Sequence, residues 1–305
     1  MSTYGGERYV AEQLRSILSQ LPALGRVMVR DDGSADATAA VVDTLADPRI
    51  TLTRGRNLGF GGSFLTLLSQ VPHEADLVMF SDQDDFWLPG KIERAWQHLQ
   101  PHAGRPALYG SAQMLVDAEL RPLHATAPWP LGPSLANALT ENIITGCTAA
   151  LNRPAVELLQ RAGVPQGVHF HDWWMYLVLS AFGRVVYDDE PTLLYRQHGG
   201  NQIGHGAGWF ARHAGIVRFL RRNDWVGILL GQVAALMRHY GDQLDRPSRR
   251  MVLEYYEVLG NQARPRWRLI FGRKQLRQSP ASDFAFRLLL LLHRTRMWPL
   301  PGKRL

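Results

Sequence analysis

The apolar run from Leu77 to Phe80 leads almost directly into Asp82-Gln83-Asp84-Asp85, and this junction constrains the fold more than any other stretch. The run predicts a buried strand that ends in three carboxylates. Crowded carboxylates repel one another and lose hydration, and a divalent cation relieves both costs. Hard oxygen ligands of this kind suit Mg²⁺ or Mn²⁺. Since ligands of open α/β sheets bind beyond the carboxyl ends of strands, the junction predicts a metal site for a phosphate or diphosphate substrate.

The first 110 residues alternate between helix-like and strand-like segments. Apolar spacing predicts helices over 7–21, 37–45 and 59–70, and short apolar runs predict strands over 26–30, 50–53 and 77–81. This βαβα order is typical of an α/β domain with a Rossmann-like, mostly parallel sheet flanked by helices.

The start of this sheet is not evident in the sequence. A doubly wound domain normally opens with a buried strand, yet Met1-Ser2-Thr3-Tyr4 has the composition of a turn. We therefore expect that translation starts upstream, or that the first strand is missing and the sheet has an unprotected edge.

The remainder of the chain divides near Gly199–Gly208. Before this point we expect helices over 91–99, 154–162 and 172–181, strands over 107–109, 113–116, 185–187 and 193–195, a loop over 124–132, and a small-residue turn leading into a strand over 143–151. Beyond Trp209 only helices and basic loops are expected. The predicted units are a catalytic domain over 1–204, with halves over about 1–110 and 111–204, and a helical region over 205–305.

The composition restricts the class of protein and the cellular compartment in which it functions. With 46% apolar and 20% charged residues, the 305-residue chain is neither disordered nor collagen-like. Its single cysteine, Cys147, excludes a disulfide scaffold and fits a reducing compartment. No secretory signal or membrane-spanning run is seen, which predicts a cytoplasmic protein, either soluble or peripheral at the inner face of the plasma membrane.

The charge is unevenly distributed along the chain. Residues 205–305 carry 19 basic and 6 acidic residues, a net charge of +13, whereas residues 1–204 carry 15 and 21, a net charge of −6. A basic, apolar-rich region suits an anionic membrane face. Because no nucleic-acid motif is legible, we expect no nucleic-acid partner.

Six short motifs occur in a fixed order, and together they resemble glycosyltransferase family 2 on the GT-A fold. The likeness is to bacterial enzymes of surface-polysaccharide synthesis, many of them rhamnosyltransferase-like, and it covers residues 1–204. The motifs are Thr3-Tyr4-Gly5-Gly6-Glu7-Arg8-Tyr9, Asp31-Asp32-Gly33-Ser34, Asn57-Leu58-Gly59-Phe60-Gly61-Gly62, Asp82-Gln83-Asp84-Asp85, His171-Asp172-Trp173-Trp174 and Tyr195-Arg196-Gln197-His198.

The resemblance implies a nucleotide site. Tyr4 would stack on the base, although Gly5 replaces the usual Asn, and Asp32 rather than Asp31 would accept hydrogen bonds from a base edge or ribose. The alternatives are a surface tyrosine and a plain Asp-Gly turn. The implied nucleotide-binding residues are Thr3, Tyr4, Asp31, Asp32, Asn57, Gly59 and Asp82.

The resemblance also implies a metal site. Asp82 and Asp84 share a face if the chain is extended, and Asp84 would ligate Mg²⁺ or Mn²⁺ at the diphosphate while Asp82 faces the ribose. His198 would be a further metal or diphosphate contact, next to Arg196, which would pair with a phosphate. Asp85 would order the loop or begin the following turn. The alternative is an acidic loop that caps the following helix.

Asp172 matches the family's general base, which removes a proton from the acceptor hydroxyl. Trp173 and Trp174 would raise its basicity and stack on the acceptor sugar. The family often has Glu before this aspartate, where this chain has His171. The alternative role is an N-cap of the following helix, and both roles can coexist.

The resemblance implies an inverting, metal-dependent transfer from a nucleotide-diphosphate sugar to a glycan or lipid-linked acceptor. Because the signature of processive synthases is not seen, we expect the transfer to be non-processive. Residues 288–292 with nearby arginines suggest a membrane-interfacial helix, or equally a helix packed on the domain. Two other functions stay open: an aspartate-dependent phosphohydrolase, disfavoured because the acidic motif lies at 82, and a non-catalytic glycan-binding protein.

Overall fold

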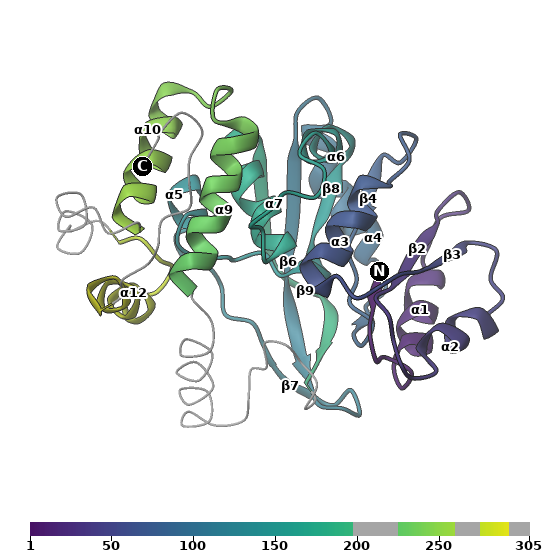
Figure 1. Ribbon diagram of the computed structural model, residues 1–305. Coiled ribbons are helices and arrows are strands. Elements are labelled where there is room, and N and C mark those ends of the chain that lie inside the picture. The colour runs from purple at the N-terminus through teal and green to yellow at the C-terminus, as the bar shows by residue number, and fades with distance from the viewer. Residues whose placement is uncertain (198–224, 260–274, 293–305) are drawn as a thin grey trace.

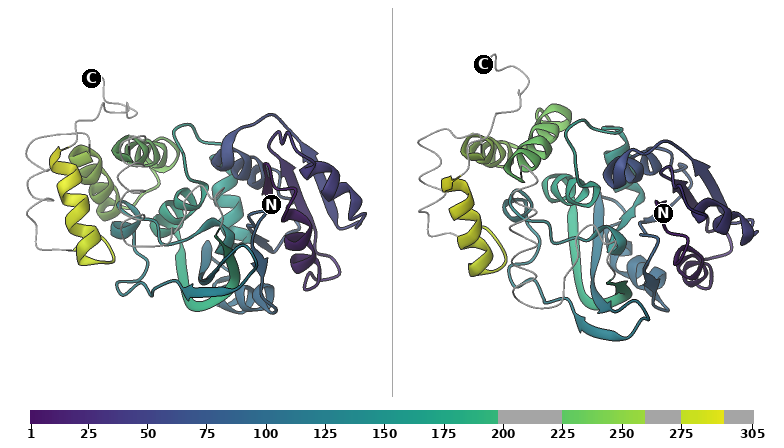
Figure 2. Two further views of the ribbon diagram at one scale, coloured as in Figure 1. Left: turned by 90° about the horizontal axis from the view of Figure 1, so that it is seen from below. Right: turned by 60° about the horizontal axis from the view of Figure 1, so that its bottom comes forward.

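The computed structural model describes residues 1–197, 225–259 and 275–292. A small N-terminal sheet with its helices lies at one end of the molecule, and α9 (Trp225–Tyr240), α10 (Arg246–Leu259) and α12 (Pro280–Leu292) lie at the other (Figure 1). A larger sheet with two long strands lies between them, and the same arrangement is seen from two other directions (Figure 2).

The N-terminal sheet is wholly parallel, in the order β1 (Ser2–Thr3), β2 (Val27–Asp31) and β3 (Ile50–Arg54). The expectation of a missing first strand is therefore wrong. The strand is two polar residues long, so it has no apolar run that sequence inspection would detect. Backbone hydrogen bonds hold it in place, from Arg30 N to Met1 O at 3.0 Å and from Asp32 N to Thr3 O at 2.8 Å.

The larger sheet is mixed rather than parallel, with the order β4-β8-β6-β9-β5 and β7 paired to β6. Among the described strands of this sheet, only β6 and β9 run parallel, and the other pairs are antiparallel. Apolar runs reveal strands but not their direction, so the expectation of a mostly parallel sheet holds for the first sheet alone. The strands are β4 (Leu77–Met79), β5 (Phe86–Trp87), β6 (Ala107–Val116), β7 (Pro122–Ala125), β8 (Ala150–Asn152) and β9 (Arg184–Arg196).

β6 and β9 are each one strand where the sequence predicts two. Gly110 interrupts the apolar pattern of β6, yet a Cβ there would lie 2.6 Å from Ile144 Cδ1, so glycine allows Ile144 to pack against the strand. Pro191 interrupts β9, where it pairs with Ala112 at a shift in register. Proline is tolerated at such irregularities.

The helices predicted before residue 198 are present, and the one over Lys91–Leu99 has the predicted bounds. Val10, Leu14 and Ile17 line one face of the first helix and are buried against β2 and its neighbours. The helices before residue 198 are α1 (Val10–Leu18), α2 (Thr38–Thr44), α3 (Gly59–Ser69), α4 (Lys91–Leu99), α5 (Leu135–Ala138), α6 (Arg153–Gln160) and α7 (His171–Phe182), with one-turn 3₁₀ helices over Gln100–His102 and Gly146–Thr148.

The C-terminal helices continue the core of the preceding domain. Trp225 of α9 packs on Trp173 of α7 with ring centroids 5.3 Å apart, and the Tyr240 hydroxyl donates to Leu158 O at 2.7 Å. The predicted boundary near 199–208 lies outside the described residues, so the division into two units stays a prediction.

α12 is packed on one side and exposed on another. Phe286 and Leu290 are buried, whereas Phe284 is 70% exposed and Leu288 44% exposed. The helix is therefore packed on one side, and a membrane-interfacial role for its exposed side stays a prediction. No helix in the described ranges combines the length and apolar character needed to cross a bilayer.

Candidate active site

The acidic loop follows β4 at the edge between the two sheets. Asp82 and Asp84 are half-buried, whereas Asp85 is 1% exposed. Burial, together with the charges of Asp84 and Asp172, raises the pKa of Asp82 to about 7. Burial and the neighbouring charges of Asp84 and Asp82 likewise raise the pKa of Asp85 well above its usual range. The pKa values of Asp82 and Asp85 are raised even though the Met1 ammonium lies near Asp82 and Lys91 lies near Asp85, and a bound cation would relieve this unfavourable charge.

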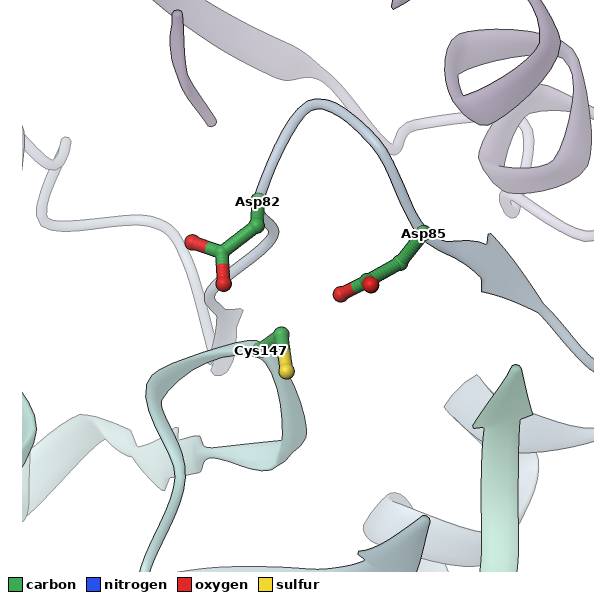
Figure 3. A group of neighbouring side chains, drawn as sticks. All are labelled: Asp82, Asp85 and Cys147. Atoms are coloured by element: carbon green, nitrogen blue, oxygen red, sulfur yellow. The ribbon is translucent and has the colours of Figure 1, made fainter. Parts of the chain in front are cut away.

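Asp82 and Asp85, rather than Asp82 and Asp84, converge with Cys147, with ligand atoms within 4.8 Å of one another (Figure 3). The chain bends at Gln83 and Asp84 and is not extended there. The extended geometry that would place Asp82 and Asp84 on one face is therefore absent. Asp85 Oδ1 accepts from Arg196 N at 3.3 Å, while Asp85 Oδ2 is buried without a hydrogen-bond partner among the described residues. This oxygen and the crowded carboxylates fit a divalent cation. Ligation by Asp84 stays a prediction.

The turn over Gly146–Thr148 connects the acidic loop to Asp172. Gly146 N donates to Asp172 Oδ2 at 3.1 Å, and the adjacent Cys147 belongs to the acidic group just described. A Cβ at Gly146 would lie 2.6 Å from His171 Nε2, so only glycine fits this position. Asp172 and the acidic loop therefore contact neighbouring residues of one turn.

Asp172 lies in the first turn of α7, whose N-cap is Phe170. Its carboxylate accepts from Trp173 N at 2.7 Å, and the side chain remains partly exposed. Burial is the main cause that raises its pKa to about 6, against the lowering effect of its hydrogen bonds. A carboxylate with this pKa is ionised at neutral pH and is a stronger base than an ordinary aspartate.

His171 was not assigned a role from the sequence, and it is buried beside Asp172. Its ring stacks on Phe64 with centroids 4.1 Å apart, and burial lowers its pKa to about 3. The imidazole is therefore neutral, and among the described residues its ring nitrogens have no hydrogen-bond partner. It fills the space behind Gly146 and Asp172 without adding charge.

The nucleotide-binding residues predicted at the N-terminus lie around the end of β1. Tyr4 is 57% exposed, which leaves a ring face open. Thr3 and Asp31 bond to each other, Oγ1 to Oδ1, at 3.1 Å, and both are buried. Asp32 is 2% exposed, pairs with Arg30, and accepts from Leu58 N at 2.8 Å. Its contacts support the turn after β2, and recognition of a base edge stays a prediction.

The glycine-rich entry of α3 combines a cap with close packing. Asn57 Oδ1 accepts from Gly59 N at 3.0 Å, and Gly59 has a φ of +73° that side chains rarely adopt. A Cβ at Gly61 would lie 2.3 Å from His169 O. These residues therefore bring the start of α3 against the segment before α7, and their contact with a nucleotide is not tested.

The prediction that Trp173 and Trp174 stack on an acceptor sugar is wrong for this structure. They are 2% and 0% exposed, respectively. α7 is apolar on nearly every side because it packs between α3, α5 and α9, and Trp173 Nε1 donates to Ala138 O at 2.7 Å. Neither indole presents a face to a ligand.

The proposed phosphate contact of Arg196 is also contradicted. Its side chain is buried, donates from Nε to Asp84 O at 2.9 Å and pairs with Glu12. Its ring contact is with Tyr9, at 4.5 Å from the centroid. The guanidinium thus supports the acidic loop from behind. His198 lies outside the described residues.

Sequence inspection gave no role to Gly146, Cys147 or Gln83. The first two belong to a small-residue turn before β8, a pattern whose only signal was its composition. Gln83 stands between two aspartates, and it bonds to the backbone of Tyr4. None of these contacts follows from local spacing because each joins residues far apart in the chain.

Comparison with known proteins gives one family and one fold. Residues 1–156 match the family described as Glycosyl transferase family 2. The dTDP-rhamnosyl transferase RfbG of Shigella flexneri is 27% identical over 245 residues, which are 74% of this chain and 80% of the relative. The UDP-Glc:alpha-D-GlcNAc-diphosphoundecaprenol beta-1,3-glucosyltransferase WfgD of Escherichia coli is 32% identical over 94 residues, 30% of this chain and 36% of the relative.

A solved structure of S. aureus TarS is similar with a TM-score of 0.53 and 16% identity, over 90% of this chain and 74% of that chain. A complex of TarS with UDP gives a TM-score of 0.50 at 16% identity, over 85% and 88% of the two chains. At this identity the likeness concerns the fold, which is of the GT-A type as predicted.

Proposed function

Because the chain belongs to glycosyl transferase family 2 and is a glycosyltransferase of polysaccharide synthesis, we propose that it transfers single sugars, with inversion, from a nucleotide-diphosphate sugar to a glycan or lipid-linked acceptor. One observation carries this proposal: Asp172 and the acidic loop contact neighbouring residues, Gly146 and Cys147, of a single turn. This proximity supports a site in which Asp172 would act as the base for the acceptor and the acidic loop would serve the leaving group.

Asp172 is the proposed general base. Its carboxylate, partly exposed and held by the backbone N–H groups of Gly146 and Trp173, would accept the proton of the attacking hydroxyl. Attack from the side opposite the leaving group inverts the anomeric centre. The two backbone donors fix the carboxylate, so little reorientation is required before proton transfer.

Asp82, Asp84 and Asp85 are the residues that would hold Mg²⁺ or Mn²⁺. When bound, such a cation would neutralise the charge that develops on the leaving diphosphate. The support is the donor set itself, which has raised carboxyl pKa values at Asp82 and Asp85 and a buried carboxylate oxygen without a partner among the described residues.

The donor would bind along β1 and β2, with Tyr4 against its base. The support is the exposed ring of Tyr4, which directly follows β1, the edge strand of the parallel sheet. The relative RfbG is named a dTDP-rhamnosyl transferase, which favours a deoxynucleoside-diphosphate rhamnose among the donors to be tested first.

The acceptor is proposed to be lipid-linked or to lie close to a membrane. Phe284 and Leu288 form an exposed apolar stripe on α12, and the sequence beyond residue 204 carries a net charge of +13. Such a helix suits the surface of an anionic bilayer. The variant Phe284→Ser with Leu288→Ser should co-sediment less with phosphatidylglycerol vesicles, whereas Leu24→Ser, a 90% exposed control, should not. Equal sedimentation of the two variants would refute membrane contact.

The rival functions make different predictions. An aspartate-dependent phosphohydrolase would release phosphate from simple esters without sugar transfer, and membership of the family disfavours it. A non-catalytic glycan-binding protein would show no turnover that depends on Asp172.

The direct test is a screen of nucleotide sugars for thermal stabilisation with Mn²⁺, followed by transfer assays with the best donor. A ligand that binds only the native state raises stability by mass action, by about 2.7 kcal/mol at a concentration one hundred times its Kd. A donor that stabilises the protein and is consumed only with an acceptor supports the proposal. Absence of stabilisation by every nucleotide sugar would overturn it.

A further inference from the structure

The side chain of Gln83 joins the acidic loop to the first turn of the chain. Gln83 Oε1 accepts from Tyr4 N at 2.8 Å, and Gln83 Nε2 donates to Tyr4 O at 2.9 Å. A primary amide that bonds to both backbone groups of one residue imitates a neighbouring strand, and it fixes the position and orientation of that residue. The contact spans 79 residues of sequence.

The first turn is adapted to this contact. A Cβ at Gly6 would lie 2.2 Å from Gln83 Oε1, so any side chain at Gly6 would displace the amide. The opposite side of the turn is held by Gly5 N, which donates to Ser34 Oγ at 3.1 Å, and by Gly6 N, which donates to Thr38 Oγ1 at 2.8 Å. The backbone of the turn is thus held by Gln83 on one side and by Ser34 and Thr38 on the other, while the Tyr4 ring is 57% exposed.

From these contacts we infer that Gln83 is a positioning residue, which holds Tyr4 in the orientation that stacks on the nucleotide base and so links the base site to the acidic loop. This inference rests on the proposed function, since it assumes that Tyr4 contacts the base. Gln83 itself need not touch the nucleotide.

The test is a double-mutant cycle read by isothermal titration calorimetry with UDP and dTDP, each with Mn²⁺. Gln83→Ala should weaken nucleotide binding about tenfold, which corresponds to about 1.4 kcal/mol. In a Tyr4→Ala background the same substitution should change the Kd less than about twofold, because there is no ring left to position. Donor KM should rise while kcat stays the same.

Two further variants complete the design. Gln97→Ala is the matched control, because Gln97 is an exposed glutamine on α4 that bonds only to Glu93, at 2.7 Å, among the described contacts. It should leave the Kd unchanged. Gly6→Ala displaces the Gln83 amide without removing the side chain, so it should weaken nucleotide binding as Gln83→Ala does. It tests the inference independently should Gln83→Ala fail to fold.

The outcomes separate the two hypotheses. If Tyr4→Ala weakens binding and Gln83→Ala does not, the positioning role is refuted and the proposed function stands. If Gln83→Ala weakens binding equally in both backgrounds, Gln83 acts independently of Tyr4 and the inference is again refuted. If the unmodified protein binds neither UDP or dTDP nor any nucleotide sugar of the thermal screen, the proposed nucleotide site and this inference both fail.

Discussion

Replacing Asp172 by Asn should strongly lower the activity while making the protein more stable at alkaline pH. The carboxyl pKa is raised from its ordinary value of 3.8 to about 6, mainly by burial. At about 1.4 kcal/mol for each pKa unit, the folded state carries about 3 kcal/mol of unfavourable free energy when Asp172 is charged. Asn removes this charge. In the variant, an amide N–H donor replaces one carboxylate oxygen. One of the two backbone N–H donors therefore loses its acceptor, which costs about 1 kcal/mol.

The balance is a stabilisation of about 2 kcal/mol for Asp172→Asn at pH 8. The difference in the free energy of unfolding between the variant and the unmodified protein depends on pH. The penalty is fully present above about pH 6, where the folded carboxyl is ionised, and it vanishes below about pH 4, where the carboxyl is protonated in both states. Urea denaturation at pH 8 and pH 4 without added metal measures both limits, and the advantage of the variant should disappear at the lower pH.

The activity of Asp172→Asn should fall by about 10²–10⁴-fold in kcat/KM, the usual contribution of a general base. In the unmodified protein, kcat/KM should fall as the pH drops below about 6, because the base is then protonated. The exposed carboxylate Asp76, at the other end of β4, serves as the control through Asp76→Asn. An Asp172→Asn protein that retains more than a tenth of the activity, or that is less stable at pH 8, would refute this reasoning.

Three further substitutions test other parts of the structure. Asp84→Ala should abolish Mn²⁺-dependent nucleotide binding in calorimetry while Asp76→Ala does not, and an unchanged affinity would remove Asp84 from the metal site. Gly61→Ala should lower the melting temperature through overpacking of about 1–3 kcal/mol, because the new Cβ would lie 2.3 Å from a backbone oxygen. Gly104→Ala, with nothing within 4 Å, is its control, and equal melting temperatures would contradict the packing described. Trp174→Ala should destabilise the core by about 3–5 kcal/mol in urea denaturation, whereas a stacking residue on the surface would produce little change.

The sequence is informative where a signal is local. The helix over Lys91–Leu99 has an apolar stripe with a glycine before it, and it forms with the predicted bounds. β1 escaped detection because a two-residue polar strand is defined only by its partner, β2. The same limit explains the larger sheet, since apolar runs carry no information on strand direction.

For the candidate site, too, the sequence indicates residue types but not their arrangement in space. The acidic loop and Asp172 are predicted as candidates because their residue types indicate metal or acid–base chemistry, but their arrangement depends on tertiary contacts. A bend at Gln83 and Asp84 turns Asp85 toward Asp82, which an extended chain would not do. Trp173 and Trp174 were misassigned because their burial depends on α9, about 50 residues farther along the chain.

The location of Cys147 gives this protein an internal reporter. It is the chain's sole cysteine and is 0% exposed, between Asp82 and Asp85. Burial and these two negative charges raise the pKa of its thiol, so alkylation by iodoacetamide requires the Gly146–Thr148 turn to separate from the acidic loop. The rate of alkylation therefore measures how often this region opens, and slower labelling with Mn²⁺ and a nucleotide would report closure around them.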